Sequence, residues 1–308
     1  MSGKEPSWDL YGALLAVLRE GSLSGAARAL GLTQPTIRRQ IEELEQELGV
    51  MFFTRSGNGL APTEAAHAAA PYAESIASAA RALGRAVSSS AQAVRGTVRV
   101  TCSEILGVEV LPPMLARLRA AWPELQIELV ATNRTEDLLR RDADVAVRMV
   151  EPVQSGLVRK RAGRIALGLF AHESYCARQA LPRSLSELTH EHQLVGPDRS
   201  RGLIDALAAM GAPVKPRNFQ IRSDSDVVQL AAVRAGLGIG VCQVPLSRAP
   251  VALVRVLPDL AFHLDAWLVT HEDLLPNARV RAVFDALTSE LADYAADKPT
   301  AKKPKRTR

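Results

Sequence analysis

Between Trp8 and Pro62, apolar positions follow a helical period that is interrupted by glycines and small residues. The first apolar stripe has the spacing of one helix face and consists of Tyr11, Leu14, Leu15 and Leu18. Gly21 ends this helix. A second short helix is predicted over residues 25–30, where small side chains allow close approach, with Ser22 or Ser24 as its cap. The pattern therefore predicts two short helices joined by a tight turn.

A third helix is predicted after the turn at Gly31, with Thr33 as its cap and Pro35 in its first turn, where a missing N–H costs nothing. Its buried stripe is expected to be Ile37, Ile41, Leu44 and Leu48. The opposite face carries Pro35, Thr36, Arg38 and Arg39, with Gln34 at its edge, and the acids Glu42 and Glu43 lie further along. Basic residues in the first turns suit a recognition helix, since those turns enter the major groove while the far end stays in solvent.

A hairpin is predicted to follow this helix. Residues 50–53 are apolar and predict a buried strand, and the Gly-rich stretch 55–59 predicts a hairpin tip. This tip would act as a wing that places Arg55 at the DNA backbone or minor groove. The alternative is a plain three-helix bundle whose exposed arginines are only solvated. The turn, the capped helix, the basic face and the hairpin together favour DNA binding.

The same residues resemble the N-terminal motifs of LysR-type transcription regulators. The matching stretches occur in the family's order and spacing: residues 20–30, 33–35, 39–41, 44–45, 48–50, 53–55 and 60–64. The resemblance implies a winged helix-turn-helix that binds double-stranded promoter DNA. The residues predicted to contact DNA are Thr33, Gln34, Pro35, Thr36, Arg38, Arg39 and Arg55. Two positions depart from the family's pattern, Arg38 in place of a common serine and Ala65 in place of a frequent glycine. Arg38 suggests an altered base preference.

One long, alanine-rich helix is predicted from Thr63 to about Ala93. A seam with alternating steps of four and three runs along it, formed by Ala65, Ala69, Tyr72, Ile76, Ala79, Leu83 and Ala86. Pro71 is expected to kink the helix, because it cannot donate a hydrogen bond to residue 67. The helix could simply lie on its own domain. A heptad seam favours a partner helix, and the family resemblance implies a dimerisation helix at this place.

From Thr97 onward, predicted strands alternate with helices. The strands are expected over residues 98–101, 125–130, 143–147, 165–171, 219–221, 237–241 and 266–270. The helices are expected over residues 111–121, 136–141, 175–179, 226–235 and 279–291. Such alternation predicts parallel strands with crossover helices. The length of this stretch suggests two lobes separated by a cleft.

Landmarks in this region are similar to those of the LysR-type effector domain, which resembles periplasmic binding proteins: residues 111–112, 122–123, 144–147, 171–175 and 235–240. The fold class expected is α/β, with a mostly α-helical winged helix-turn-helix joined by a long linker helix to a two-lobed effector domain. The expected bounds are 1–62 for the DNA-binding domain, 63–93 for the linker and dimerisation helix, 94–295 for the effector domain and 296–308 for a disordered basic tail. The first lobe would comprise about 97–162 and 270–293, and the second lobe about 163–269.

Ligands of open α/β sheets lie beyond the carboxyl ends of strands. This rule predicts as effector contacts Thr101, Cys102, Ser103, Thr132, Asn133, Arg148, Pro197 and Ser223. Hydroxyl donors and an arginine suit a small carboxylate or another polar metabolite. The alternatives are that Ser and Asp before a helix are ordinary caps, and that Arg148 pairs with a surface acid. Glu104 and Asp224 would repel an anion.

Sequence patterns of catalysis and of cofactor binding are weak in this chain. Gly236-x-Gly238-x-Gly240 ends a predicted helix and leads into a strand, the reverse of a dinucleotide loop, so we interpret it as a helix C-cap with close packing. His190 and His192 lack a further ligand pair, which favours a solvated loop. We expect a regulator rather than an enzyme, with no cofactor and no metal. The rival hypothesis is an enzyme or binding protein whose N-terminal bundle mediates assembly.

Composition and charge change this picture little. The 308 residues suit a small domain plus a larger one, and 47% hydrophobic with 23% charged residues is ordinary for a globular protein. The net charge of +5 comes from six basic residues in 298–308, a stretch expected to attract phosphates or to act as a plain solubilising tail.

Cysteine usage and hydropathy bear on the compartment. Three widely spaced cysteines fit a reduced, cytoplasmic setting. No signal peptide or membrane span is expected, since the longest uncharged run, residues 235–247, falls short of the roughly 20 residues that a span needs. The expected partners are promoter DNA, a small-molecule effector and further copies of the chain, as a homodimer that pairs again to a homotetramer.

Overall fold

The computed structural model describes residues 6–56, 59–87, 93–133, 143–152, 156–209, 211, 214–248 and 250–297. These residues divide into a headpiece, here residues 6–87, and a larger unit, here residues 93–297. The predicted helix over 136–141, the tip of the predicted wing at 57–58 and the basic tail from 298 lie outside the described residues.

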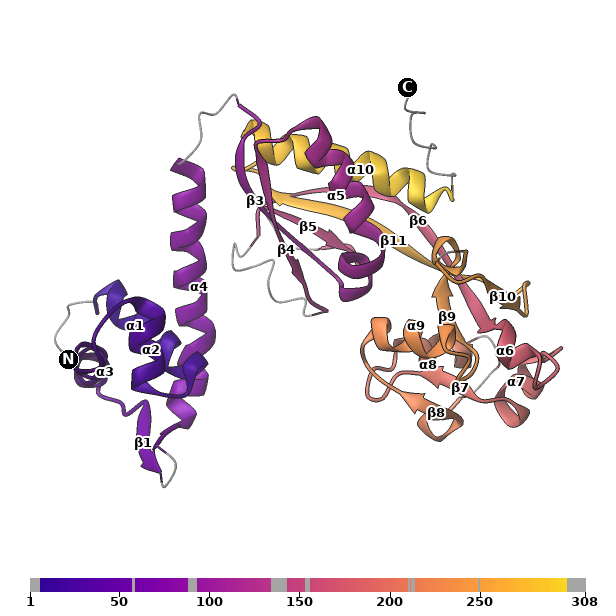
Figure 1. The fold of residues 1–308 in the computed structure, drawn as a ribbon, viewed down its shortest axis with the longest axis horizontal. Coiled ribbons are helices and arrows are strands. Elements are labelled where there is room, and N and C mark those ends of the chain that lie inside the picture. The colour runs from indigo at the N-terminus through magenta and orange to yellow at the C-terminus, as the bar shows by residue number, and fades with distance from the viewer. Residues whose placement is uncertain are drawn as a thin grey trace, which may run out of the picture. The chain divides into compact units, whose positions relative to one another are not determined.

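The headpiece contains three short helices, a hairpin and a long helix (Figure 1). The elements are α1 (Trp8–Glu20), α2 (Leu23–Leu30), α3 (Gln34–Leu48), β1 (Phe53–Ser56), β2 (Gly59–Pro62) and α4 (Glu64–Val87). Gly21, Gly31 and Gly49 each follow a helix in the left-handed conformation, which glycine adopts without the penalty of a Cβ. The predicted turns at Gly21 and Gly31 are therefore confirmed.

One apolar core joins these helices. Ala13, Ala26, Ile37 and Leu44 are fully buried in it, and Phe52 is buried at the start of the hairpin. Burying one such large apolar side chain contributes about 1.5–3 kcal/mol. This core fixes which face of α3 points inward and which face remains outside.

Two expectations for this core are wrong. Leu48 is 42% exposed, because the last turn of α3 runs past the point where other elements cover it. Val50 and Met51 are also exposed, and the strand begins only at Phe53. Periodicity identifies the apolar face of an element but does not tell where along it the core ends.

Helix α4 continues through Pro71. Its first turns pack on the headpiece itself, where Ala66 and Ala73 are buried and Ala65 and Ala69 are half-buried against the core. Further along the predicted seam, Tyr72 is 76% exposed and Leu83 is 61% exposed. The N-terminal part of the seam therefore packs on the headpiece, and the C-terminal part is exposed to solvent.

The larger unit is built on a seven-stranded mixed sheet with the order β10-β6-β11-β5-β3-β4, in which β9 also pairs with β6. The strands are β3 (Gly96–Cys102), β4 (Leu125–Ala131), β5 (Val145–Arg148), β6 (Leu157–His172), β9 (Gly240–Gln243), β10 (Leu253–Val256) and β11 (Phe262–His271). A second, parallel pair consists of β7 (Leu194–Gly196) and β8 (Phe219–Arg222).

The expectation of parallel strands holds only in part. β3 is parallel to both β4 and β5, but β6, β9, β10 and β11 pair antiparallel. The reason is that β6 and β11 are long neighbouring strands that run in opposite directions. Strands in a βαβ series would run in the same direction. The alternation of strands and helices along a sequence does not distinguish these two connections.

Strands β6 and β11 run through both lobes of this unit, and the chain passes from one lobe to the other along each of them (Figure 1). One end of β11 pairs with β5 of the first lobe, and the C-terminal half of β6 pairs with β9 and β10 of the second lobe. The first lobe adds the π-helical turn η1 (Leu106–Val110), α5 (Leu111–Ala121) and α10 (Ala278–Ala295). The second lobe adds α6 (Glu173–Cys176), α7 (Leu185–Glu191), α8 (Gly202–Ala209), η3 (Pro216–Asn218), α9 (Asp226–Arg234) and η4 (Val244–Ser247).

Apolar side chains fill both lobes. The larger core lies between the sheet and the helices α5 and α10, and includes the fully buried Val100, Leu125, Leu268 and Leu287. A second core around Tyr175 and Phe219 lies within the second lobe. Among the described helices of the chain, none is both long and apolar enough to cross a membrane.

Candidate DNA-binding surface and ligand cavity

Helices α2 and α3 form a helix-turn-helix whose turn is closely determined by local hydrogen bonds. The Ser22 hydroxyl accepts the Gly25 N–H at 3.0 Å and caps α2. The backbone N–H of Leu32 donates to the Ala27 carbonyl at 2.9 Å, which closes the turn at Gly31. Thr33 caps α3, and the Ser24 hydroxyl donates to the Gln34 amide oxygen at 3.2 Å. These contacts fix the first turn of α3 relative to α2.

The outer face of α3 is polar and basic. Thr33, Gln34, Pro35, Arg38 and Arg39 are exposed, and Thr36 is half-exposed with its hydroxyl 2.8 Å from that of Thr33. Neither Arg38 nor Arg39 forms a hydrogen bond or ion pair with any described residue. The two guanidinium groups therefore extend into solvent at the end of the helix where unpaired backbone N–H groups also gather.

The hairpin is fastened to α3 by a carboxylate. One oxygen of Glu45 accepts the backbone N–H groups of Phe52 at 2.6 Å and Phe53 at 3.1 Å. The Thr63 hydroxyl donates to the Met51 carbonyl at 2.8 Å and accepts the Ala66 N–H at 3.3 Å. The hairpin is thus tied at its base both to α3 and to the start of α4.

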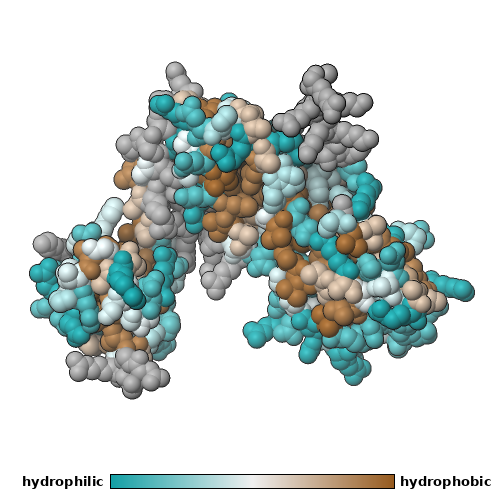
Figure 2. Space-filling model, viewed as in Figure 1, coloured by the Kyte–Doolittle hydropathy of each residue, from teal (hydrophilic) through white to brown (hydrophobic). Residues whose placement is uncertain are grey.

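The larger unit contains a cavity of about 360 Å³. Residues of both lobes line it, among them Ser103 after β3 and Leu203 on α8. Its walls are mainly apolar and include Ile105, Leu167, Leu203, Val241, Phe262 and Leu264. The hydropathy view shows apolar patches on the visible face of this unit among mainly hydrophilic surroundings (Figure 2). A ligand in this cavity would bury apolar area against both lobes at once.

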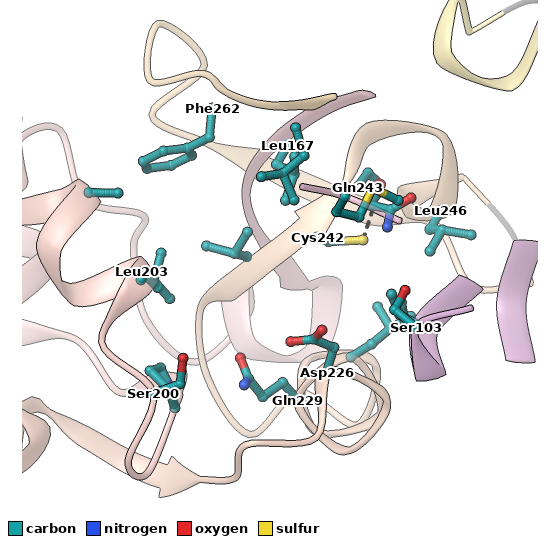
Figure 3. A pocket seen from close by; sticks show the side chains of 18 of the residues that line it. Ser103, Leu167, Ser200, Leu203, Asp226, Gln229, Cys242, Gln243, Leu246 and Phe262 are labelled. Atoms are coloured by element: carbon teal, nitrogen blue, oxygen red, sulfur yellow. Dashed lines mark hydrogen bonds between the residues drawn. The ribbon is translucent and has the colours of Figure 1, made fainter. Parts of the chain in front are cut away.

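A few polar groups interrupt the apolar lining. In Figure 3 the Asp226 carboxylate and the Gln229 amide point into the cavity, with Ser200 and Leu203 on one side and Cys242 and Gln243 on the other. Gln229 donates from its amide nitrogen to the Ser223 carbonyl at 2.7 Å. The Asp226 pKa is raised by burial and by repulsion from the nearby Glu104 carboxylate.

Two further lining residues have polar atoms available to a ligand. The Ser103 hydroxyl is buried and has no hydrogen-bond partner among the described residues. Gln243 is only 6% exposed and accepts the Tyr294 hydroxyl at 2.7 Å through its amide oxygen, while no described residue accepts from its amide nitrogen. A buried hydroxyl without a partner is costly, and a ligand that bonds to Ser103 removes this cost.

Asp224 closes one rim of the cavity. Its carboxylate accepts the backbone N–H groups of Asp198, Arg199 and Ser200 at about 3 Å. These hydrogen bonds hold the pKa of Asp224 below its usual value. The carboxylate thereby fixes the loop that bears Pro197 and Ser200 against the N-terminus of α9.

Polar contacts also join the two lobes beside the cavity. The Ser225 hydroxyl donates to a Glu104 carboxylate oxygen at 2.7 Å. Arg234 on α9 binds Glu109 on η1 through two hydrogen bonds of 2.8 and 2.9 Å, and both side chains are largely buried. These contacts link helices of different lobes, so a change in lobe spacing has to break or stretch them.

Burial disfavours the thiolate form of the two buried cysteines. Burial raises the pKa of the Cys102 thiol to about 11 and that of the Cys242 thiol to about 12, so both are protonated at neutral pH. In the part of the chain that is described, no group of three or more His, Cys, Asp or Glu side chains is placed to hold a metal ion.

Comparison with protein families accounts for both units. Residues 8–67 match the family model of the bacterial regulatory helix-turn-helix protein, lysR family, and residues 91–292 match that of the LysR substrate binding domain. The chain belongs to the LysR family of transcription regulators. Its headpiece is therefore a DNA-binding helix-turn-helix, and its larger unit is the effector-responsive regulatory domain.

Individual relatives agree with this membership. An HTH-type transcriptional regulator of Xanthomonas campestris is 33% identical over 181 residues, which span 58% of this chain and 52% of the relative. The HTH-type transcriptional activator TtdR of Escherichia coli is 25% identical over 92% of this chain and 94% of its own length. The crystal structure of full-length CbnR complexed with its target DNA shares the fold, with a TM-score of 0.65 and 19% identity over 91% of this chain and 99% of that chain.

Most residues predicted to contact DNA lie together in this LysR-type regulator. Thr33, Gln34, Pro35, Thr36, Arg38 and Arg39 all lie in the cap and first turns of α3. Arg55 lies on β1 opposite Leu60, and its side chain is outside what the structure describes. Glu45 was not among the predicted site residues, because its contact with the backbone of Phe52 and Phe53 forms only once α3 and the hairpin have packed together.

The eight residues predicted to contact the effector are divided by the structure. Ser103 and Pro197 line the cavity. Thr101, Cys102, Thr132, Asn133, Arg148 and Ser223 are not among its lining residues. Arg148 is 7% exposed and donates to the Thr101 hydroxyl at 3.2 Å and to the Thr132 carbonyl at 3.4 Å. Asn133 accepts the Glu104 N–H, and Ser223 accepts the Ser225 N–H.

Several residues that line the cavity were not predicted from the sequence. Asp226 and Gln229 lie on α9, one helical turn apart, and Gln243 ends β9. Asp226 lies three residues after the predicted Ser223, in the first turn of the helix that follows, so the rule of strand ends stopped just short of it. Leu203 and Ala206 on α8 and Phe262 on β11 carry no polar signal, and an apolar lining residue looks like a core residue in a sequence.

Proposed function

We propose that this LysR-type regulator binds promoter DNA through the first turns of α3 and changes its occupancy or geometry on the promoter when a small molecule fills the cavity between the lobes. The observation that carries this proposal is the exposed end of α3, where Arg38 and Arg39 have no partner among the described residues. Thr33, Gln34, Pro35 and Thr36 would contact phosphates and base edges beside them, and Arg55 would reach the backbone from the wing.

Phosphate and base contacts explain why these residues suit DNA. A helix N-terminus presents backbone N–H groups and a positive dipole end to phosphates. Arginine adds a planar fork of donors that fits guanine edges or phosphate oxygens, and each good contact to a base is worth about 1–3 kcal/mol. The acids of α3, Glu42, Glu43 and Glu47, lie further along the helix, where repulsion by the phosphates is weaker.

Dimerisation through α4 forms part of this proposal. Two recognition helices reach successive major grooves only if they lie about 34 Å apart, which a single headpiece does not provide. The exposed seam residues Tyr72, Ala79 and Leu83 offer a surface for a second α4, and pairs of dimers would give the tetramer. The linker would span residues 63–93, and the DNA-binding and effector domains would span 1–62 and 94–295.

The cavity is the proposed effector site. Its lining comes from both lobes, so a ligand that prefers one lobe spacing would shift the equilibrium between two arrangements of the regulatory domain. The buried hydroxyl of Ser103 and the amide of Gln243 would orient this ligand. We infer that the chain has no catalytic activity of its own and acts in the cytoplasm, where a regulator finds its promoter.

Footprinting tests the DNA-binding part of the proposal. We expect the purified full chain to protect a site in the DNA that flanks its own gene. Arg39→Ala should weaken this binding roughly tenfold or more, since it removes one charged contact to DNA. Arg281→Ala, which removes an exposed arginine from α10 of the larger unit, is the matched control and should leave the footprint unchanged.

The same experiment can contradict the proposal. No protection at low salt, where phosphate attraction is strongest, would count against DNA binding by this headpiece. Equal affinity of Arg39→Ala and Arg281→Ala would show that α3 does not face DNA. Circular dichroism and the elution volume of each variant separate this result from unfolding.

A further inference from the structure

The ionisable side chains that line the cavity are acidic apart from a protonated thiol. Among the described lining residues, Asp224 and Asp226 carry carboxylates, Cys242 carries the thiol, and none is lysine, arginine or histidine. Asp226 is the first residue of α9, and its carboxylate points into the cavity (Figure 3). Glu104 adds a third negative charge behind it, held by the Ser225 hydroxyl. The electrostatic potential at this end of the cavity is therefore negative.

Arginines that neighbour lining residues in sequence, or that take part in the lobe contact, are engaged elsewhere or exposed. Arg148 is buried and donates to Thr101 and Thr132, neither of which lines the cavity. Arg234 is bound by Glu109 through two hydrogen bonds, so its charge is locally compensated. Arg199 lies in the loop that Asp224 holds, but its side chain is 90% exposed, and Arg201 is exposed and pairs with Asp205. A carboxylate ligand would thus enter an apolar cavity without a cationic partner, and only the neutral donors of Ser103 and Gln243 would offset part of its desolvation.

Hydrogen-bond acceptors gather around Asp226. Gln229 lies one helical turn further along α9 and uses its amide nitrogen for the Ser223 carbonyl, which leaves its amide oxygen available to the cavity. The buried Ser103 hydroxyl, which lacks a partner among the described residues, can accept a hydrogen bond as well. An ammonium or amidinium group has several donors and no acceptor, and it matches such a set of acceptors.

We propose that the effector of this chain is a small organic cation, with one ammonium or amidinium group bound by Asp226 and an apolar body packed on Leu203, Phe262 and Leu264. This inference rests on the proposed function, in which the cavity is the effector site. It replaces the small carboxylate that the sequence suggested. Asp224 contributes long-range attraction only, because its carboxylate already accepts three backbone N–H groups.

Three probes with one ring and different head groups test the ligand class: cyclohexylmethylammonium, cyclohexylmethanol and cyclohexanecarboxylate. Titration calorimetry and thermal unfolding on the full chain would compare them. We expect the ammonium to bind roughly tenfold tighter than the carboxylate, since a hydrogen bond to a charged group is worth about this factor or more. The alcohol should lie between them, because it keeps the apolar contacts without a charge.

Matched variants assign the preference to Asp226. Asp226→Asn keeps the size and shape of the side chain and removes its charge. In this variant the ammonium should bind only as tightly as the alcohol, and the affinity of the alcohol should stay the same as in the wild type. Asp205→Asn removes an exposed acid of α8 that does not line the cavity, and should keep the preference for the cation. Equal effects of the two variants, or a carboxylate that binds as tightly as the ammonium, would overturn the inference.

A cavity-filling variant separates this inference from the proposed function. Ala206→Phe places a ring among the lining residues and should weaken all three probes together. If the carboxylate binds best and Ala206→Phe abolishes its binding, the cavity remains the effector site and only the cation is wrong. If no probe raises the melting temperature of the wild-type chain, both the site and the ligand class are wrong. The melting temperature of each variant without probe controls for folding.

Discussion

Glu45 illustrates how one side chain of this regulator positions a whole hairpin. Its carboxylate accepts two consecutive backbone N–H groups, those of Phe52 and Phe53, at the point where the chain leaves α3 and enters β1. A carboxylate acceptor makes these hydrogen bonds stronger than neutral ones. Since Phe52 and Phe53 are both buried, the same residue aligns the hairpin with the apolar core and with the DNA-facing helix.

Replacing Glu45 should loosen the hairpin. Glu45→Ala leaves two backbone donors without their acceptor, which costs about 1–3 kcal/mol of local stability. Hydrogen exchange measured by mass spectrometry should show faster exchange in a peptide that covers residues 50–56. Glu45→Gln keeps an acceptor oxygen and should have a smaller effect.

Glu47→Ala on the same helix is the control for the Glu45 variants. Glu47 is exposed, and no hydrogen bond joins it to a described residue. Its removal should leave exchange at 50–56 unchanged. Identical protection in Glu45→Ala and in the wild type would show that these two hydrogen bonds do not hold the hairpin.

At the scale of elements, local patterns predicted the headpiece well. Thr33 and Pro35 mark the start of α3, Gly31 marks the turn before it, and Ile37 and Leu44 identify its inner face. Each of these signals acts within a few residues, so it can be read from the sequence alone. Leu48, in contrast, shares the period of Ile37 but is exposed, because burial there depends on how far the neighbouring elements extend.

The cavity was much harder to predict. Ser103 and Pro197 were found because they follow strands that the sequence shows clearly. Arg148 was selected by the same rule, yet it turns toward Thr101 and Thr132. Where the lobes meet depends on β6 and β11, two long strands that pair antiparallel over ten positions. The pairing of strands distant in sequence depends on many contacts and leaves no local pattern.

Helix α4 has one seam with two different environments. Ala65 and Ala69 pack on the headpiece, whereas Leu83 is 61% exposed and would meet a second α4 in the proposed dimer. Leu83→Glu places a charge on that surface and should shift the chain toward monomers, since a buried charge without a partner is strongly unfavourable. Sedimentation velocity at several protein concentrations would measure the shift in the dissociation constant.

The control for Leu83→Glu adds the same charge on the other side of α4. His67 is exposed and lies roughly opposite Leu83 on a helical wheel of 100° per residue. His67→Glu should keep the oligomeric state of the wild type. Dimers that survive Leu83→Glu with unchanged affinity would place the dimer contact elsewhere, and α4 would then serve only its own headpiece.

At the scale of the regulatory domain, the two lobes are joined both covalently and by polar contacts. The strands β6 and β11 are continuous through both lobes, so they permit bending but no separation. The contacts that set the lobe spacing are Glu109 with Arg234 and Glu104 with Ser225, and both flank the cavity. Glu104 also raises the pKa of Asp226, so the lobe contact and the proposed ligand contact share one electrostatic environment.

The Glu109–Arg234 pair should therefore stabilise the arrangement in which the cavity is formed. The two side chains are 19% and 15% exposed, so solvent screens their attraction less than that of a surface pair. A double-mutant cycle with Glu109→Gln and Arg234→Met isolates their interaction from the other contacts of Arg234. We expect a coupling of about 0.5–3 kcal/mol, the range for residues in direct contact, from the unfolding midpoints of the four proteins.

Ligand affinity tests whether the Glu109–Arg234 pair also sets the lobe spacing, which a measurement of stability alone does not show. If the pair favours the closed arrangement, Glu109→Gln should weaken binding of any ligand held by both lobes, because part of its binding energy then restores the closed spacing. The Arg161–Asp265 ion pair, which joins β6 to β11 on the exposed surface, provides the control through Asp265→Asn. That variant should change neither the midpoint nor the affinity appreciably. A Glu109→Gln variant with reduced stability but wild-type affinity would mean that the pair only holds the fold and that the cavity responds to its ligand without moving the lobes.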